Sequence, residues 1–233
     1  GSLEMDRTER IDIRWVGSAA DASGHAVIKH ILYCVSGSVP TYRNGKWIRV
    51  PAFSDPEEIR FPYPLPTLTV VHAGHPEQLT LPRHIAVDDV TCKGTLYPRA
   101  AMEAVRLAVR MNLTRDDIAI EKAARFIYRS GALVSAAMRL SKKGPKTSAA
   151  RVDISGVRHG QHRRVSFSLI DRISRMTAVP AAVAALRIVQ GAISGKGVLP
   201  PEAALDPEPF LAALAEQGIV IHEERQVSDE YIP

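Results

Sequence analysis

The chain has 233 residues, 45% of them hydrophobic, and a formal net charge of +5, which is enough apolar content for a globular protein with a large buried core. Its longest apolar stretches, such as residues 178–186, fall short of the roughly 18 to 20 residues that span a bilayer, which excludes a transmembrane helix and a membrane partner. The N-terminus has no apolar signal-peptide segment and Gly1–Ser2 is typical of a cloning remnant, so we expect a cytoplasmic protein.

Neither the cysteines nor the basic residues of the chain form a recognisable motif. Cys34 and Cys92 lack the spacing of a zinc site, and we expect two buried, inert thiols. Basic residues concentrate in 141–146 (SKKGPK) and 158–164 (RHGQHRR). Both segments are predicted to be solvated loops or turns, with phosphate or carboxylate binding as the alternative. Neither carries stacking aromatic residues or a groove-reading helix, so no nucleic-acid partner is expected.

The first predicted elements are a strand and a helix. Ile11–Val16 (IDIRWV) alternates apolar and polar residues, which is typical of a half-buried strand. Asp21 or Ser23 is expected to cap the following helix, which closes near Gly37.

Four further strands are predicted before residue 94, two of them in a hairpin. Pro40–Val50 forms a hairpin around Asn44–Gly45, the strongest short signal for a two-residue turn. Repeated prolines restrict Pro51–Pro66 to edge strands or extended loops. Leu68–His72 is predicted to be a central strand, and Val87–Lys93 another short one.

The middle of the chain is predicted to be helical and then to form a second hairpin. Helices are expected over Pro98–Met111 and Asp116–Leu140, the second of which Gly131 bends or splits. Ala150–Ser155 and Arg164–Leu169 both alternate around a glycine-containing turn, which predicts a longer antiparallel hairpin.

Residues that commonly cap helices predict the helix boundaries in the C-terminal part of the chain. Thr177 is predicted to cap a helix with Pro180 in its first turn. Asp206–Pro207 starts the last helix and Gly218 ends it, before a final strand at Ile219–His222.

The order of these elements predicts the fold class. Strands arrive as hairpins separated by long helices, which indicates an α+β fold with a mixed, mostly antiparallel sheet and helices packed on it. We expect one domain over residues 11–223, with residues 1–10 as a tag remnant and flexible lead-in and residues 224–233 as a flexible tail.

The chain has no recognisable dinucleotide site. A pyrophosphate is normally held by a glycine-rich turn between a strand and a helix, and no G-x-G-x-x-G occurs here. GAISGKG at 191–197 follows a predicted helix rather than a strand, so it is expected to be a helix end and turn. We therefore predict no cofactor-binding residue in this chain.

Several segments together resemble the C-terminal part of saccharopine dehydrogenase-like proteins. The resemblance extends from about Ile11 to Glu223, and its most specific pieces are GHPEQLTLP at 74–82 and the KGVLPPE…DPEPFL tail at 196–211. The other segments are RWVGSAADASGHA, YRNGKWIRVPAFSDPEEIRFP, VVHAGHPEQLTLPRHI and MTAVPAAVAALRIVQ.

This resemblance implies a function. Members of the family pair a Rossmann domain for NAD or NADP with a C-terminal α+β domain that holds the substrate and often forms a dimer. The resemblance thus implies an oxidoreductase that acts on an amine, imine or carbonyl compound such as an amino or keto acid. Its Rossmann domain would lie in cis upstream or on a separate chain, and the present chain would be a homodimer that is inactive alone. The alternative is a non-catalytic dimerisation or ligand-sensing module that retains the fold.

His75 and Glu77 are the predicted catalytic residues. They follow the predicted strand Leu68–His72, where functional side chains are commonly displayed. His75 could move the proton that accompanies hydride transfer, and Glu77 could orient it; a structural hydrogen-bonded pair is the alternative. His72 and His75 are not expected to bind a metal, because strand and loop geometry does not bring residues three apart together.

Lys93, Arg83 and Thr177 are the predicted substrate-binding residues. Lys93 and Arg83 could hold a substrate carboxylate, with a solvent-directed side chain as the alternative for each. Thr177 exposes a predicted helix N-terminus that could bind an anionic group, although capping alone also accounts for it. No nucleophile motif is present, so hydrolase chemistry is not expected.

Overall fold

Strands dominate the architecture of the chain. The computed structural model describes residues 1–21, 24–140, 146–193 and 195–228, without the side chains of residues 131–140. These residues form a nine-stranded sheet. The strands are β1 (Arg7–Ser18), β2 (Ser38–Arg43), β3 (Lys46–Pro51), β4 (Glu57–Arg60), β5 (Thr67–His72), β6 (Val87–Tyr97), β7 (Ser148–Arg158), β8 (Gln161–Asp171) and β9 (Ile221–Ser228).

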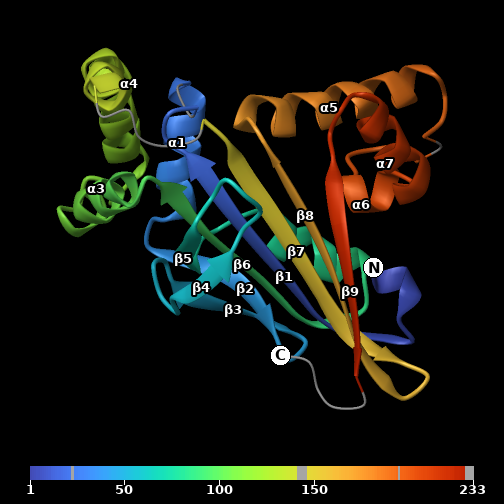
Figure 1. Cartoon of the computed structure of the whole chain (residues 1–233). Helices are drawn as coiled ribbons and strands as arrows, with labels where there is room; N and C mark the ends of the chain where they lie inside the picture. Colours follow the sequence, from blue (N-terminus) through green and yellow to red (C-terminus); the bar gives the residue numbers. More distant parts are fainter. Residues whose placement is uncertain (22–23, 141–145, 194, 229–233) are drawn as a thin grey trace.

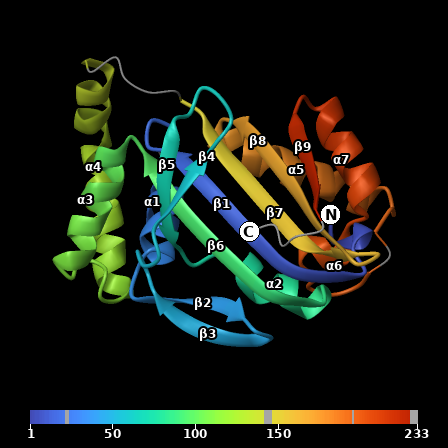
Figure 2. The same cartoon turned by 60° about the horizontal axis from the view of Figure 1, so that its bottom comes forward.

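Helices gather at the two ends of the sheet. They are α1 (His25–Cys34), α2 (Glu77–His84), α3 (Arg99–Arg110), α4 (Asp117–Leu140), α5 (Ile173–Val189), α6 (Pro201–Ala204) and α7 (Pro207–Glu216), after a short 3-10 turn at Ser2–Glu4. α1, α3 and α4 lie at one end and α5, α6 and α7 at the other (Figures 1 and 2). None of the described helices is both long and apolar enough to cross a membrane.

The sheet is mixed, as the sequence predicts. Its strand order is β3-β2-β6-β1-β7-β8-β9, and β5 pairs with β6 and with β4. Among the described strands, β1 and β6 pair in parallel, whereas the other pairs are antiparallel. This confirms the α+β class with a mostly antiparallel sheet.

Strand β1 separates the two faces of the sheet. Asp12 pairs with Thr91 of β6 and with Asp153 of β7, so these side chains share one face. Ile11, at the neighbouring position, is buried on the opposite face. We call the two sides the charged face (Asp12, Arg14, Lys93, Arg151 and Asp153) and the helix face (Ile11, Ile13, Trp15, Cys92 and Gly94).

Separate apolar clusters hold helices and strands against the two faces. On the helix face, α1 and α3 contribute to a cluster of Cys34, Val35, Val71, Ala73, Leu96 and Met102. A second cluster on the helix face joins α5 and α7 around Val183, Leu214 and Ile219. On the charged face, the segment from β4 to β5 packs over the end of β1 through Val16, Phe61, Leu65, Val70 and Ala149. This packing brings the loop and strand around residues 55–57 above the charged residues of β1 and β6.

Both predicted hairpins are confirmed. β2 and β3 meet at Asn44–Gly45, whose φ angles of 49° and 73° are those a two-residue hairpin turn requires. β7 and β8 meet at His159–Gly160. The loop prediction for 158–164 is therefore wrong for most of its residues, because only His159 and Gly160 form the turn and residues 161–164 belong to β8. Most of the predicted loop at 141–146 lies outside the described residues.

The predicted helix boundaries are correct at some positions and wrong at others. The carboxylate of Asp206 accepts a hydrogen bond from the Glu208 backbone, and α7 begins there as predicted. α4 is continuous through Gly131 and does not split. α2 is a helix where a loop was predicted, and Glu77 is its first residue.

Two predicted caps are wrong. α1 begins after Gly24 without a side-chain cap, and Ser23 lies outside the described residues. Asp21 instead accepts a hydrogen bond of 2.6 Å from the backbone of Ile173, at the start of α5. Thr177 lies inside α5, where its hydroxyl donates to the Ile173 carbonyl at 2.8 Å, so Pro180 is not in the first turn either.

Two strand predictions also need correction. β5 joins β6 through Val71 and His72 only, and the central strand is β1, between β6 and β7. β1 begins at Arg7 and β9 ends at Ser228, so regular structure extends beyond the expected limits of 11 and 223.

Candidate functional site

Arg14 is the centre of a buried ion-pair network on the charged face. Its Nη1 lies 2.6 Å from Oδ2 of Asp153 and its Nη2 lies 2.7 Å from Oε1 of Glu57. Arg14 is 6% exposed, and a buried guanidinium requires such partners. Asp153 accepts further hydrogen bonds from Arg151 and from the Ser166 hydroxyl.

Lys93 extends this network toward the molecular surface. Its Nζ lies 2.9 Å from Oδ2 of Asp55 and 3.3 Å from Oε2 of Glu57. Burial opposes ionisation of Glu57, but Arg14 and Lys93 together outweigh it and lower the pKa of this carboxyl. Glu57 thus bridges the buried Arg14 and the cation nearer the surface.

Three side chains that can carry a positive charge surround the exposed carboxylate of Asp55. Besides Lys93, the His72 Nε2 lies 3.4 Å and the Arg43 Nη2 lies 3.6 Å from its Oδ2. The Asp55 side chain is nevertheless 56% exposed. The hydrogen bond from Lys93 is the main cause that lowers the pKa of Asp55. We call Arg43, Asp55, His72 and Lys93 the carboxylate pocket.

His72 is the buried imidazole of this pocket. Its side chain is 1% exposed, and neither ring nitrogen has a hydrogen-bond partner in the described residues. Burial lowers the pKa of His72, and the nearby Lys93 lowers it further. Both effects favour the neutral form of the ring.

A second cluster lies on the helix face. The Nδ1 of His75 is 2.7 Å from Oε2 of Glu77, and its Nε2 is 3.4 Å from Nε2 of His30. The same His30 nitrogen is 3.4 Å from the Cys34 sulfur. The rings of Trp15 and His75 are 5.9 Å apart. We call His30, Cys34, His75 and Glu77 the histidine cluster.

Backbone packing brings the histidine cluster together. The Gly74 backbone donates to the Cys34 carbonyl at 2.6 Å, and a Cβ at Gly74 would lie only 3.1 Å from Val39. A larger residue would therefore push His75 away from α1.

Burial determines the protonation of this cluster. It raises the pKa of the Cys34 thiol to about 12, and burial together with His75 lowers the pKa of His30. Burial opposes ionisation of Glu77, but the hydrogen bond from His75 outweighs it and lowers the pKa of Glu77. Cys34 is thus a protonated thiol when no other group binds it, and it is buried as predicted.

The structure brings His75 and Glu77 together as predicted, and their catalytic role stays a prediction. Lys93 is 6% exposed in the interior of β6, so the solvent-directed alternative for its side chain is wrong. Arg83 is exposed on α2 with its guanidinium 5.8 Å from the Trp47 ring centre. Because Thr177 does not begin a helix, it exposes no helix N-terminus to an anion.

Sequence reasoning missed several residues of both clusters. Asp12 and Arg14 lie two apart in a predicted strand, which already places them on one face. His30 and Cys34 are four apart in a predicted helix, a spacing that brings two side chains together. Nothing in the local sequence indicated that Asp55 and Glu57 would lie above them.

The described residues do not fit a nicotinamide dinucleotide. β1 leads into α1 without a G-x-G-x-x-G. Gly94, where β6 meets β1, makes room for a side chain instead, because a Cβ there would lie 2.1 Å from the Trp15 ring.

The fold and the two clusters define an α+β domain with helices on one face of a sheet and a polar network on the other. A family model described as the saccharopine dehydrogenase C-terminal domain matches residues 31–219. The chain belongs to this family, which is associated with saccharopine dehydrogenase-like oxidoreductases that are in general nicotinamide-dependent. A search of curated proteins found no match.

The ion-pair network predicts a large stability loss for one carboxylate. Asp153→Asn removes the negative charge shared by Arg14, Arg151 and Arg164. Arg14 then keeps only Glu57 and Asp12 as counter-charges, so the free energy of unfolding should fall by about 3 kcal/mol, the lower end of the range for breaking a buried ion pair. Urea denaturation followed by circular dichroism measures this change.

The matched control is Asp88→Asn. Asp88 also pairs with an arginine of β1, Arg7, but both side chains are exposed, so the loss should be much smaller than in Asp153→Asn. Equal losses in the two variants would show that the buried network does not carry this stability.

Proposed function

We propose that the chain is the substrate-binding domain of a nicotinamide-dependent oxidoreductase that acts on an amine, imine or carbonyl compound such as an amino or keto acid. A Rossmann domain, in cis or on a separate chain, would bind NAD or NADP. The observation that carries this proposal is the carboxylate pocket, in which a single exposed carboxylate has Lys93, His72 and Arg43 around it.

In this proposal, the Asp55 carboxylate occupies the position that a substrate carboxylate would take. It belongs to the loop before β4 rather than to a strand, and its backbone φ is +53°, a conformation that costs energy for residues other than glycine. Lys93 is fixed in β6 and half of the Asp55 side chain is open to solvent. An incoming carboxylate can therefore displace Asp55 and keep the same cations.

His72 is the imidazole that a substrate in this pocket would meet. Lys93 and Cys92 are neighbours on β6 and point to opposite faces, and the histidine cluster lies on the Cys92 side. A small substrate held by Lys93 is therefore separated from His75 by the sheet. In this proposal His72, with unused ring nitrogens, is the proton carrier for such a substrate, whereas a role for His75 and Glu77 requires a substrate on the helix face.

Ligand binding tests the pocket directly. We expect isothermal titration calorimetry to detect binding within a panel of 2-oxoglutarate, pyruvate, L-glutamate and L-lysine. Lys93→Met should weaken it at least about tenfold, because a charge-assisted hydrogen bond contributes about 1.5–3 kcal/mol. Asp55→Asn should tighten it, because the competing charge is removed.

Two controls accompany this measurement. His84→Ala should leave binding unchanged, because His84 is exposed on α2 and is not part of the carboxylate pocket. Methyl esters of the bound acid should not bind. If no acid of the panel binds, or if the esters bind equally well, the carboxylate pocket is not a substrate site.

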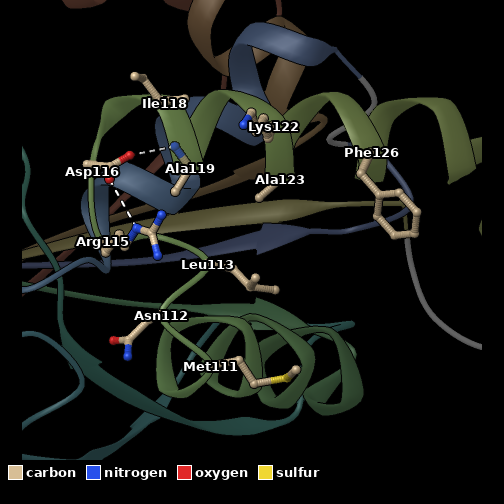
Figure 3. Close-up of a pocket in the computed structure, with 10 residues that line it drawn as sticks. All are labelled: Met111, Asn112, Leu113, Arg115, Asp116, Ile118, Ala119, Lys122, Ala123 and Phe126. Atoms are coloured by element: carbon tan, nitrogen blue, oxygen red, sulfur yellow. Dashed lines mark hydrogen bonds and ion pairs between the residues drawn. The ribbon is translucent and has the colours of Figure 1, made fainter.

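A second candidate function, assembly into a homodimer, is supported by an apolar groove. The groove has a volume of about 460 Å³ and lies between the end of α3 and the first turns of α4. Figure 3 shows Met111, Leu113 and Phe126 bordering the same space. The Phe126 side chain is 73% exposed and Ile118 is 68% exposed, and apolar patches of this kind commonly mark protein contacts.

Sedimentation velocity tests this assembly. We expect a dimer for the wild-type chain and a monomer for Phe126→Ser, because a polar residue removes apolar area from the contact. Val198→Ser is the control, since Val198 is even more exposed than Phe126 but lies outside the groove, and this variant should not change the mass. A monomeric wild-type chain, or a dimer that Phe126→Ser leaves intact, would contradict this interface.

A further inference from the structure

Three potential metal-ligating side chains converge on the helix face. His30 and Cys34 come from adjacent turns of α1 and His75 from the segment between β5 and α2. One ligand atom of each, two imidazole nitrogens and one sulfur, lies within 4.8 Å of the others. We propose that His30, Cys34 and His75 bind a divalent transition-metal cation such as Zn²⁺.

The spacing of these atoms matches a tetrahedral site. Zinc lies about 2.0–2.1 Å from histidine nitrogen and about 2.3 Å from cysteine sulfur. Tetrahedral angles then separate two nitrogens by about 3.3 Å, and a nitrogen and a sulfur by about 3.6 Å. The corresponding distances here are 3.4 Å between His30 and His75 and 3.4 Å between His30 and Cys34. The third pair, His75 and Cys34, lies within 4.8 Å, so these two side chains would have to approach each other on binding if they start at that limit.

Glu77 orients the His75 ring in the way that carboxylates commonly orient metal-binding histidines. Its carboxylate lies 2.7 Å from Nδ1 of His75, so the proton of this ring is on Nδ1 and Nε2 offers its lone pair. Such a carboxylate, histidine and metal arrangement fixes the ring and strengthens it as a ligand. Glu77 thus leaves the His75 Nε2 available as a ligand on the side that faces His30.

The ligands are also held in place before any cation binds. The buried Gln78 accepts a hydrogen bond of 3.0 Å from the His75 backbone, and the Gly74 backbone is tied to the last turn of α1 at Cys34. Binding transfers the Cys34 thiol proton to solvent and leaves a thiolate on the cation. Three protein ligands leave a fourth position for water, as in zinc sites that take part in chemistry.

This site is independent of the carboxylate pocket. It lies on the opposite side of β6, and no residue belongs to both groups. A failure of the proposed substrate site therefore leaves the metal site untouched, and the reverse also holds.

Cobalt spectroscopy tests the metal site on the purified chain without an affinity tag. Titration with Co²⁺ should give one bound ion per chain, with an intense near-ultraviolet band from thiolate-to-cobalt charge transfer and the visible bands of four-coordinate cobalt. Cys34→Ser should abolish the charge-transfer band. Glu77→Gln should weaken cobalt binding by roughly 10–100-fold, as is typical when a residue that orients a metal ligand is lost. His30→Ala and His75→Ala should weaken it more, because each removes a ligand.

The controls are chosen to separate ligand loss from misfolding. His84→Ala removes an exposed histidine of α2 and Cys92→Ala removes the other buried cysteine, and both should bind cobalt as the wild-type chain does. His30 is exposed, so His30→Ala should fold even if Cys34→Ser does not. No charge-transfer band in the wild-type chain, or full cobalt affinity in His30→Ala, would overturn the proposal.

Discussion

The alternation of side chains along β1 is the constraint on which both candidate sites depend. β1 lies between β6 and β7 and is paired on both edges, so its side chains point to either one face or the other. Asp12 and Arg14 lie on the charged face, while Ile11 and Trp15 lie on the helix face. A shift of one residue in this register would exchange the two sets and bury charge against the helices.

The two faces of the sheet are stabilised by different interactions. The helix face is covered by apolar contacts from α1 and α3, which contribute stability through buried area. The charged face instead buries ionised groups, which is favourable only when each one has partners. The two terminal nitrogens of Arg14 bond Asp153 and Glu57, while its Nε has no hydrogen-bond partner among the described residues. Glu57 comes from a strand that packs over β1. The same requirement for partners brings Lys93 and Asp55 together near the surface, where a ligand can compete for the cation.

The sequence predicted the local parts of this arrangement well. Alternation over residues 11–16 and the Asn44–Gly45 turn depend on neighbours in the chain, and both predictions are confirmed. His75 and Glu77 are two residues apart, and their contact was also predicted. His30 and Cys34 are four residues apart in the predicted helix, but no contact between them was predicted.

The parts that were missed depend on tertiary contacts. Arg14 and Asp153 are 139 positions apart, and no periodicity indicates which distant carboxylate reaches a strand. Asp21 is a residue type that commonly caps helices, but it caps α5 instead of α1. The residue type alone does not indicate which helix N-terminus lies beside it in the folded chain. His75 reaches His30 only because Gly74 packs against the end of α1.

The most direct test of the central claim is nicotinamide turnover by the natural gene product, or by this chain together with a Rossmann-domain partner, assayed over amino acids, imines and keto acids. If the charged face holds the substrate, Lys93→Met should raise KM strongly for a carboxylate substrate, while His84→Ala leaves the kinetics unchanged. Turnover that is indifferent to Lys93, or the absence of any nicotinamide turnover, would contradict the assignment of the charged face as a substrate site.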